Sequence, residues 1–460
     1  MLKVSVIITA YNYGRYLRRA IESVLSQRFE DYEVIVVDDC SNDDTPEVLE
    51  EFIAHPRLKI ITHSENQGFI RSCHEAIELS RGEYIIRLDA DDYLDENALL
   101  VLSNLLDTDR ELGLVYSDYF TVSAEGRIID YVRLPGMNSE VKLRDIPPNG
   151  ATMMFRRSCY AAVGGYDLSL ACQDGYDLWS KFRHRFRVQN VNLPLFYYRR
   201  HGANFGEDSE RLLSARRYIK KRQVADEKIP KPRVLGLVPA GANDCCAHLA
   251  LRQLGNKPLI AYTINEALST PVLDRVVLIT EDEGVAAVAR QYGVEIKLLP
   301  SGLARRELQH MVLYMLEQLA DEGFSADIVA VLSPNSPFRK ADHITEAVNT
   351  MMLFPVDSVV SVCQDNNYHY RHGPCGLVPL FKKNHLRREE EALYEENGAV
   401  YASRVTAIDE DGFLGNRIGH IVMTREASVY VGSEFDFGMV RGLVNDEIGF
   451  AGVHCYQART

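Results

Sequence analysis

The sequence predicts an α/β chain with two domains in tandem, each built on a largely parallel sheet. Two observations favour this class. Strand patterns rich in β-branched residues alternate with amphipathic helical patterns, which is typical of parallel strands joined by right-handed helical crossovers. The alternation stops once, at a charged segment with two prolines, and then begins again. The length of 460 residues agrees, because one domain usually takes roughly 100–200 residues.

The composition excludes several classes of protein. Hydrophobic residues make up 46% and charged residues 25% of the chain, as in an ordinary globular protein. No apolar run approaches the roughly 18 residues that a membrane span needs. The net charge of −14 argues against a general nucleic-acid binder. The nine cysteines are odd in number and form no CxxC pair, so we expect no disulfide framework, no structural zinc and a reducing cytoplasm.

The first half alternates four strand patterns with three helical ones. We read its opening apolar run as a strand rather than a signal peptide, because it lacks a small-residue cleavage site and leads directly into a turn and a helix. The pattern EVIVVDD is near-continuously apolar, as expected for a strand buried on both faces of a sheet. The predicted strands are 4–9, 32–38, 58–62 and 84–88, and the predicted helices are 16–27, 43–52 and 69–79.

The second half repeats this organisation after a basic helix at 212–223. Residues 225–233 carry two prolines and several charges and are read as a linker. We therefore expect domains at 1–224 and 234–460. The predicted strands of the second domain are 234–239, 275–280 and 328–332, and its predicted helices are 258–268 and 284–292.

Polar clusters follow three of the strands in the first half. Tyr11-Asn12, Asp38-Asp39 and the run from Asp89 to Asp92 each stand where a strand ends. Parallel strands bring their carboxyl ends to one rim, and ligands of such sheets bind there. The sequence thus predicts a site at this rim.

The run Asp89-x-Asp91, with Asp92 beside it, carries the chemistry. Carboxylates this close repel one another unless a cation neutralises them. Hard divalent ions such as Mg²⁺ or Mn²⁺ prefer oxygen ligands and often bridge to substrate phosphates. This pattern indicates a metal–diphosphate site. The alternative is a strand end followed by a capped helix, with Asp91 or Asp95 as the cap.

A series of longer motifs places this run in a family. The segments VSVIITAYNYGRYLRRAIESVLSQ, EVIVVDDCSNDDT, ENQGF, SRGEYIIRLDADD, YAAVGGYD, QDGYDLW and PLFYYRRH occur in this order over the first ~200 residues. They resemble the family 2 glycosyltransferases of the GT-A fold. The resemblance implies a Rossmann-like nucleotide-binding domain and a metal-dependent transfer from a nucleoside-diphosphate sugar.

The resemblance also implies roles for single residues. The nucleotide-binding residues would be Thr9, Ala10, Tyr11, Asp38, Asp39 and Asp89. Asp91 and His201 would hold Mn²⁺ or Mg²⁺, and Asp174 would be the catalytic base. A single base on one face implies single displacement with inversion. Asp92 and Arg71 are further candidates for the site.

Both Asp174 and His201 also have plain structural interpretations. Asp174 could be a surface helix N-cap, and His201 could be an ordinary loop histidine. The chain departs from the family twice. Cys73 and His74 stand where the family often has Arg-Asn, which puts the donor contacts in question. Gln173 stands where the family often has Glu, which leaves the base in place.

The second half resembles CMP-sialic acid synthetases, a cytidylyltransferase family. VLGLVPA, LGNKPLIAYTINEAL, VAVLSPNSPFR and YEENGAVYASR carry this resemblance. It implies a second Rossmann-like domain and a homodimer. The family's triphosphate-binding Arg-Gly-Gly-Ser-Lys is replaced by residues 241–246, which include the acidic Asp244, and no lysine or arginine follows until Arg252. Tyr430 and Gly432 replace its metal-binding Asp-x-Asp, so we expect an inactive domain.

Two residues of this half still fit the sugar-side motifs. They are Arg339 and Asn397, although an Asn397-Gly398 pair also suits a turn between strands.

The sequence therefore predicts a metal-dependent inverting glycosyltransferase with a cytidylyltransferase-like domain for dimerisation or recognition. The expected donor is a UDP-sugar, and the acceptor is a glycan, glycolipid or protein in bacterial surface glycan or glycoprotein assembly. We expect a cytoplasmic location, with peripheral association at the inner face of the membrane as a variant. Two alternatives stay open. One is a bifunctional enzyme that also makes a CMP-sugar, and the other is a non-enzymatic scaffold that binds sugar nucleotides.

Overall fold

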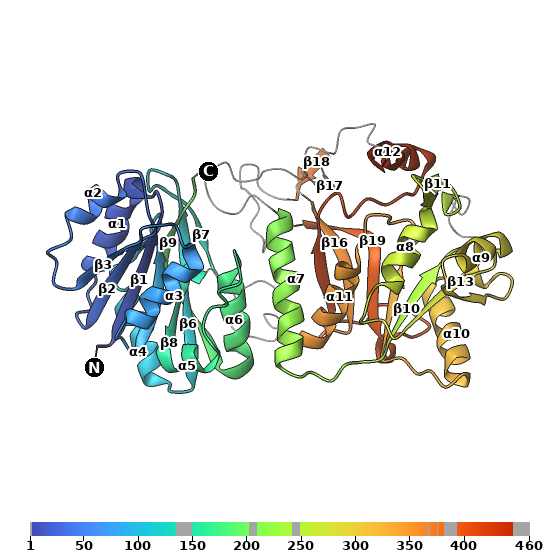
Figure 1. Ribbon diagram of the computed structural model, residues 1–460, viewed down its shortest axis with the longest axis horizontal. Coiled ribbons are helices and arrows are strands. Elements are labelled where there is room, and N and C mark those ends of the chain that lie inside the picture. The colour runs from blue at the N-terminus through green and yellow to red at the C-terminus, as the bar shows by residue number, and fades with distance from the viewer. Residues whose placement is uncertain are drawn as a thin grey trace. The chain divides into compact units, whose positions relative to one another are not determined.

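The computed structural model describes residues 2–134, 150–201, 209–241, 249–365, 367, 369–374, 376–380 and 393–444. Contacts within the chain divide it into two compact units, Met1–Arg216 and Arg217–Thr460. Each unit is an α/β structure, with helices packed along a twisted sheet (Figure 1). The predicted α/β class is therefore confirmed in both halves.

The first unit contains a mixed sheet in the order β3-β2-β1-β4-β8-β6-β9-β5, with β7 paired to β6. Strands β1 to β4 are parallel to one another, and β8 is antiparallel to β4. The elements are β1 (Val4–Ala10), α1 (Gly14–Leu25), β2 (Tyr32–Asp38), α2 (Thr45–Glu50), β3 (Leu58–Thr62), α3 (Phe69–Leu79), β4 (Tyr84–Asp89), β5 (Tyr93–Leu94), α4 (Ala98–Thr108), β6 (Leu112–Val122), β7 (Ile128–Val132), a 3₁₀ turn (Gly150–Thr152), β8 (Met153–Arg156), α5 (Arg157–Ala162), α6 (Asp174–Arg185), β9 (Arg187–Arg199) and α7 (Ser209–Asp226).

The predicted strands of this unit agree closely with the structure, including β3, which is only partly buried. Every residue of β1 and β2 is buried. Val6 and Ile8 of β1 share one hydrophobic core with Leu17 and Ile21 of α1. The predicted helices exist, but α1 begins and ends two residues earlier than its pattern, and α2 is shorter at both ends. The N-cap of α2 is Asp44, which makes no side-chain capping bond, and Asp43 before it accepts the Thr45 amide at 3.0 Å.

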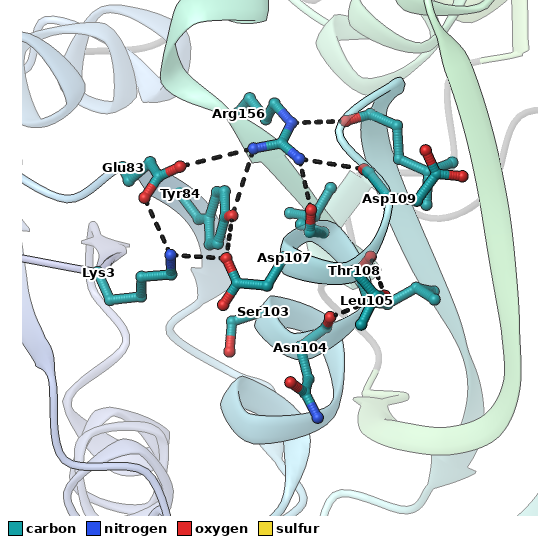
Figure 2. A network of polar contacts seen from close by, with 12 residues as sticks. Lys3, Glu83, Tyr84, Ser103, Asn104, Leu105, Asp107, Thr108, Asp109 and Arg156 are labelled. Atoms are coloured by element: carbon teal, nitrogen blue, oxygen red, sulfur yellow. Dashed lines mark hydrogen bonds and ion pairs between the residues drawn. The ribbon is translucent and has the colours of Figure 1, made fainter.

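A polar network stabilises the end of this sheet at which β1 and β4 begin (Figure 2). Arg156, at the end of β8, donates to the carbonyls of Leu106 and, at 3.1 Å, Asp109, which end helix α4. Lys3 lies between the carboxylates of Glu83, at 3.0 Å, and Asp107, at 2.6 Å. The cation of Arg156 thus satisfies carbonyls that a helix leaves open at its C-terminus.

The second unit has a sheet in the order β14-β13-β10-β15-β19-β16-β20. Strands β14, β13, β10 and β15 are parallel, in the same 3-2-1-4 arrangement as β3, β2, β1 and β4. The elements are β10 (Val234–Pro239), β11 (Gln253–Leu254), β12 (Lys257–Pro258), α8 (Leu259–Leu268), β13 (Arg275–Thr280), α9 (Glu283–Arg290), β14 (Glu295–Leu298), a 3₁₀ turn (Leu303–Arg305), α10 (Leu308–Asp321), β15 (Ile328–Leu332), α11 (Ala341–Leu353), β16 (Ser358–Asp365), β17 (Tyr370–Gly373), β18 (Gly376–Pro379), β19 (Leu393–Arg404), a 3₁₀ turn (Val405–Ala407), β20 (Ile418–Met423) and α12 (Glu434–Val444).

The change from the first unit to the second falls inside helix α7. Within the first unit, Arg216 donates to the Gln173 side chain at 3.0 Å. Within the second, Lys220 is buried and pairs with Glu346 at 3.0 Å. The helix continues to Asp226, two residues into the segment read as a linker. None of the helices in the described ranges is both long and apolar enough to cross a bilayer.

Candidate active site

The strand register of the first unit brings the predicted nucleotide residues to one rim. Thr9 lies opposite Asp89 of β4, and Ala10 lies opposite Asp38 of β2. The strand order runs β3-β2-β1 on one side of β1 and continues with β4 on the other. In sheets of this kind, ligands bind at the carboxyl end of the strands where the order reverses. Tyr11 follows directly and is 44% exposed, so its ring is accessible to a planar ligand.

The loops after β1 and β2 lock together around Asn12. This residue adopts a left-handed conformation with φ of 60°. Its amide donates to Ser41 Oγ at 2.9 Å, and its side-chain oxygen accepts from the Asn42 amide at 2.8 Å. Gly14 approaches so closely that a Cβ would lie 2.6 Å from backbone atoms of Asp44 and Thr45. The rim is therefore a fixed surface rather than two separate loops.

Asp39 is almost fully buried, and its carboxylate organises the neighbouring turn. Its two oxygens accept the amides of Gln67 and Gly68, each at 2.8 Å. His63 Nδ1 lies 2.7 Å from the same carboxylate, and His63 Nε2 lies 2.9 Å from Glu75. Burial disfavours charge on the His63 ring, but its bonds to Asp39 and Glu75 outweigh this and raise its pKa. Asp38 accepts the Ser41 amide at 3.0 Å.

Asp91 and His201 meet although 110 residues separate them. His201 Nε2 lies 2.9 Å from Asp91 Oδ2. The imidazole is stacked on Tyr16, with ring centroids 5.1 Å apart, and lies edge-on to Tyr13. The local turn before α4 is made by Asp95, which accepts the Asn97 amide at 3.0 Å. Asp91 is thus not a helix cap, and His201 is not an isolated loop residue.

Negative charge accumulates around Asp91. Burial raises the pKa of Asp89 to about 6. The positive charge of Arg87 opposes this shift, whereas the negative charges of Asp91 and Asp174 add to it. Burial and the neighbouring carboxylates also raise the pKa of Asp92. One oxygen of Asp92 accepts the Arg199 amide at 2.7 Å, whereas Oδ2 has no hydrogen-bond partner among the described residues. A cation here would relieve this repulsion.

Arg87 joins the acidic run to Asp174. This buried arginine lies 3.2 Å from Asp89 through Nε and pairs with Asp174 through Nη1. Its guanidinium also lies over the Phe69 ring, 4.6 Å from the centroid. Burial disfavours its charge, but Asp89 and Asp174 outweigh burial and raise the pKa of Arg87. Its charge also acts on the buried thiol of Cys73.

Asp174 is the first residue of α6, with a side chain only 14% exposed. The N-cap position belongs to Gln173, which has φ of 63° and makes no side-chain capping bond. The surface N-cap interpretation of Asp174 therefore does not describe this structure. Its carboxylate faces inward, onto Arg87.

The remaining candidates lie outside this cluster. Arg71 is exposed on α3 and makes no ion pair or hydrogen bond to another residue in the described ranges. In the second unit, Arg339 is fully buried and donates to the carbonyls of Ser333 and Ala399 at 3.0 and 3.1 Å. Asn397 bonds Ser361 and Ser428 at 2.6 and 2.8 Å, and Gly398 beside it has φ of 67°.

The residues at the rim fit a divalent ion. In the described part of the chain, no three histidine, cysteine or carboxylate side chains form a ready-made cage. Asp91 and His201 nevertheless converge, with the half-satisfied Asp92 nearby. Mn²⁺ and Mg²⁺ are commonly held by one or two protein side chains, with phosphate oxygens and water completing the shell. This donor set suits that mode of binding.

Sequence reasoning missed Arg87, His63 and Glu75. Arg87 lies inside an apolar strand pattern, YIIRLD, and a charged residue in a strand buried on both faces was the available signal. No local pattern relates His63, after β3, to Glu75 in α3. Their meeting at Asp39 depends on how α3 packs on the sheet.

The fold and the acidic rim define the first unit as an α/β domain with a candidate ligand site at the carboxyl ends of its parallel strands. The family model for Glycosyl transferase family 2 matches residues 5–157, and that for Cytidylyltransferase matches residues 250–404. The "Putative glycosyltransferase EpsE" of Bacillus subtilis is 31% identical over 204 residues, which are 42% of this chain and 72% of that protein. The chain belongs to the family 2 glycosyltransferases through its first unit.

Other relatives are matched over smaller parts of their length. The "Chondroitin synthase" of Escherichia coli is 31% identical over 202 residues, 44% of this chain but only 29% of that enzyme. The second half is similar to the "N-acylneuraminate cytidylyltransferase" of Escherichia coli O18:K1:H7, at 28% identity over 45% of this chain and 51% of that protein. Among solved structures, Staphylococcus aureus TarS 1-349 in complex with UDP-GlcNAc matches at 20% identity with a TM-score of 0.41, over 48% of this chain and 66% of that one.

Proposed function

We propose that the first unit transfers a sugar from a nucleoside-diphosphate donor to a hydroxyl acceptor, with inversion at the sugar carbon. The observation that carries this is the Arg87 bridge, which connects the acidic run to Asp174. A transferase of this type needs a site for the leaving diphosphate and a base for the incoming hydroxyl within reach of one sugar. The names of its relatives, chondroitin synthase and putative glycosyltransferase, support the same reaction class and a role in bacterial surface glycan assembly.

The residues divide into a donor side and an acceptor side. Tyr11 packs against the base, and Asp39 accepts hydrogen bonds from the base or ribose. Asp174 takes the proton of the acceptor hydroxyl while the new glycosidic bond forms on the face opposite the departing diphosphate. Arg87 holds Asp174 in place for this step. The donor-side residues are Thr9, Ala10, Tyr11, Asp38, Asp39 and Asp89, and a UDP-sugar is the proposed donor.

Asp91 and His201 would hold Mn²⁺ or Mg²⁺ at the diphosphate. When bound, such an ion neutralises charge on the leaving group as a Lewis acid. Asp92 supports this position by holding the Arg199 amide of β9, just before His201. The imidazole is fixed by its stacking on Tyr16, so its orientation does not depend on the ion.

Asp174→Asn tests the proposed base. The amide cannot accept the acceptor proton, so we expect turnover to fall by about 10³-fold. Donor affinity should stay within about twofold, because a base acts in the transition state and not in the ground state. The measurement is transfer from a UDP-sugar panel with Mn²⁺, alongside nucleotide binding. Near-normal turnover in this variant would remove Asp174 from the mechanism.

Asp91→Ala is the complementary change on the donor side. We expect the Mn²⁺-dependent part of UDP affinity to fall about 10- to 100-fold, as for other metal-site residues. A Mn²⁺-dependent affinity equal to that of the unaltered protein would show that Asp91 is no ligand.

If neither the unaltered protein nor any variant transfers or hydrolyses a sugar from the panel, the scaffold alternative is favoured.

For the second unit we propose recognition or dimerisation without cytidylyl transfer. The bifunctional alternative requires that the full-length protein consume CTP in the presence of a sialic-acid-like sugar and Mg²⁺. We expect no pyrophosphate release under these conditions. Steady release would favour the bifunctional enzyme.

A further inference from the structure

The second unit contains a cavity of about 810 Å³ at the carboxyl ends of its parallel strands. Its floor is aliphatic and includes Leu299 and Met311. Much of its polar lining comes from β19 and from the segment after β20, and includes Glu395, Glu396, Tyr401, Arg425 and Tyr430. A volume of this size holds a ligand of one or two sugar rings or a nucleotide.

The described lining does not suit a metal-bound triphosphate. Tyr430 lines the cavity with a neutral side chain, and its hydroxyl accepts from the Asn335 side chain at 3.3 Å. The two carboxylates that follow are both used locally. Glu434 pairs with Arg252, and Asp436 accepts the Gly432 amide at 3.1 Å and the Ser433 hydroxyl at 2.7 Å. No ligand set for a hard cation therefore faces the cavity from this segment.

The cations needed for phosphate are likewise few. Arg425 is the single basic residue among those lining the cavity in the described ranges, against two glutamates. Arg252, the first basic residue after β10, is turned to Glu434 and lies over the Phe437 ring, 4.2 Å from its centroid. A triphosphate placed here would meet an unfavourable local charge.

The same groups suit a carbohydrate. Carboxylates accept hydrogen bonds from sugar hydroxyls, and the amphipathic face of a tyrosine packs on the apolar face of a pyranose. Tyr430 is 40% exposed, and Tyr401 donates its hydroxyl to Glu396, which orients that carboxylate. We propose that this cavity is a metal-independent binding site for a sugar unit that bears neither phosphate nor carboxylate. The site is a binding site only, and it does not depend on the activity of the first unit.

Thermal shift of the full-length protein tests this, with N-acetylglucosamine, glucosamine, N-acetylneuraminic acid and CTP as probes, each with and without Mg²⁺. We expect at least one of the two sugars without a carboxylate to raise the melting temperature by about 3 °C at roughly ten times its Kd, independently of Mg²⁺. Tyr430→Ala should weaken this response about tenfold, and Glu396→Gln should weaken it as well. N-acetylneuraminic acid and CTP should give no response that depends on Tyr430.

Two control variants assign the response to the correct unit. Phe435→Ala removes an aromatic ring that is 74% exposed and does not line the cavity, so it should leave the response unchanged. Tyr11→Ala alters the nucleotide rim of the first unit and should leave it unchanged too. Three results would overturn the proposal. They are a sugar response that Tyr11→Ala abolishes, a CTP–Mg²⁺ response that Tyr430→Ala abolishes, and the lack of any response to either N-acetylglucosamine or glucosamine.

Discussion

Arg87 shows how one buried side chain can coordinate two halves of a site. It is a cation shared by Asp89 and Asp174, which come from β4 and the start of α6. The Arg87 charge also reaches the buried thiol of Cys73 in α3.

Replacing Arg87 should separate positioning from folding. A lysine keeps the charge but cannot bridge two carboxylates with a planar fork, so Arg87→Lys should lower kcat about 10- to 100-fold and change the donor KM less than about threefold. Arg87→Met leaves two partly buried carboxylates without this cation and should also cost about 2–3 kcal/mol of unfolding free energy, less than for a fully buried pair. Transfer kinetics and urea unfolding measure both effects. Arg81→Lys, which alters an arginine with a 76% exposed side chain, is the matched control, and an equal loss of kcat there would contradict the argument.

His63 should make stability depend on pH in a specific direction. Its pKa is raised above the ordinary value of 6.5 in the folded protein, so its stabilising contribution is fully present below that value. The contribution is lost as the pH rises through the folded pKa. Urea unfolding between pH 6 and 9 should therefore show the advantage of the unaltered protein over His63→Gln shrinking as pH increases. His55→Gln, at a ring that accepts one backbone amide at 3.3 Å, is the matched control, and an equal change with pH in that variant would contradict the assignment to His63.

At the scale of elements, Arg156 determines how helix α4 ends. Its guanidinium side chain is 12% exposed and bonds the carbonyls of Leu106, Asp109 and Leu112. Arg156→Ala leaves these buried acceptors unsatisfied, so we expect a loss of about 2–4 kcal/mol in unfolding free energy. Chemical denaturation measures it. Arg187→Ala is a close control, because Arg187 pairs with Asp109 and Glu111 at the surface and its loss should cost less than about 1 kcal/mol. Equal losses would show that the Arg156 bonds are not what stabilises this end of α4.

Sequence predicts these elements best where one local pattern decides the outcome. The strand β2 matches its predicted bounds because an unbroken run of β-branched residues flanked by turn residues allows little else. The rim itself also follows from sequence, since parallel strands must end at the same edge. The partners within the rim do not follow. His201 reaches Asp91, and His63 reaches Asp39, through tertiary packing that no local spacing encodes.

The second unit illustrates the same limit. Strands β10, β13 and β15 match their predicted ranges, whereas β14, β16, β19 and β20 were not predicted. That Tyr430 replaces a carboxylate was an implication of the family resemblance. The pairing of Arg252 with Glu434 and the use of Asp436 by its own helix start required coordinates. These contacts, rather than the missing motif alone, describe what the cavity offers a ligand.

At the scale of the molecule, the two units have separate hydrophobic cores and should respond separately to ligands. Calorimetry of the full-length protein should show two unfolding transitions. UDP with Mn²⁺ at roughly ten times its Kd should raise one of them by about 3 °C, and chelation of the metal should reverse this shift. Asp91→Ala should remove the shift without changing the other transition. A single transition that moves as a whole would indicate that the units unfold together.

The two ends of the strands in the first sheet have different roles. The end at which β1 and β4 begin is tied by Lys3, Glu83 and Arg156, whereas the end at which they stop carries the acidic groups. Under the function proposed above, substitutions that change sugar or acceptor preference can accumulate at one end of the strands, while the anchoring at the other end preserves the fold. Directed evolution of this preference should therefore begin with residues at the carboxyl ends of β1 and β4.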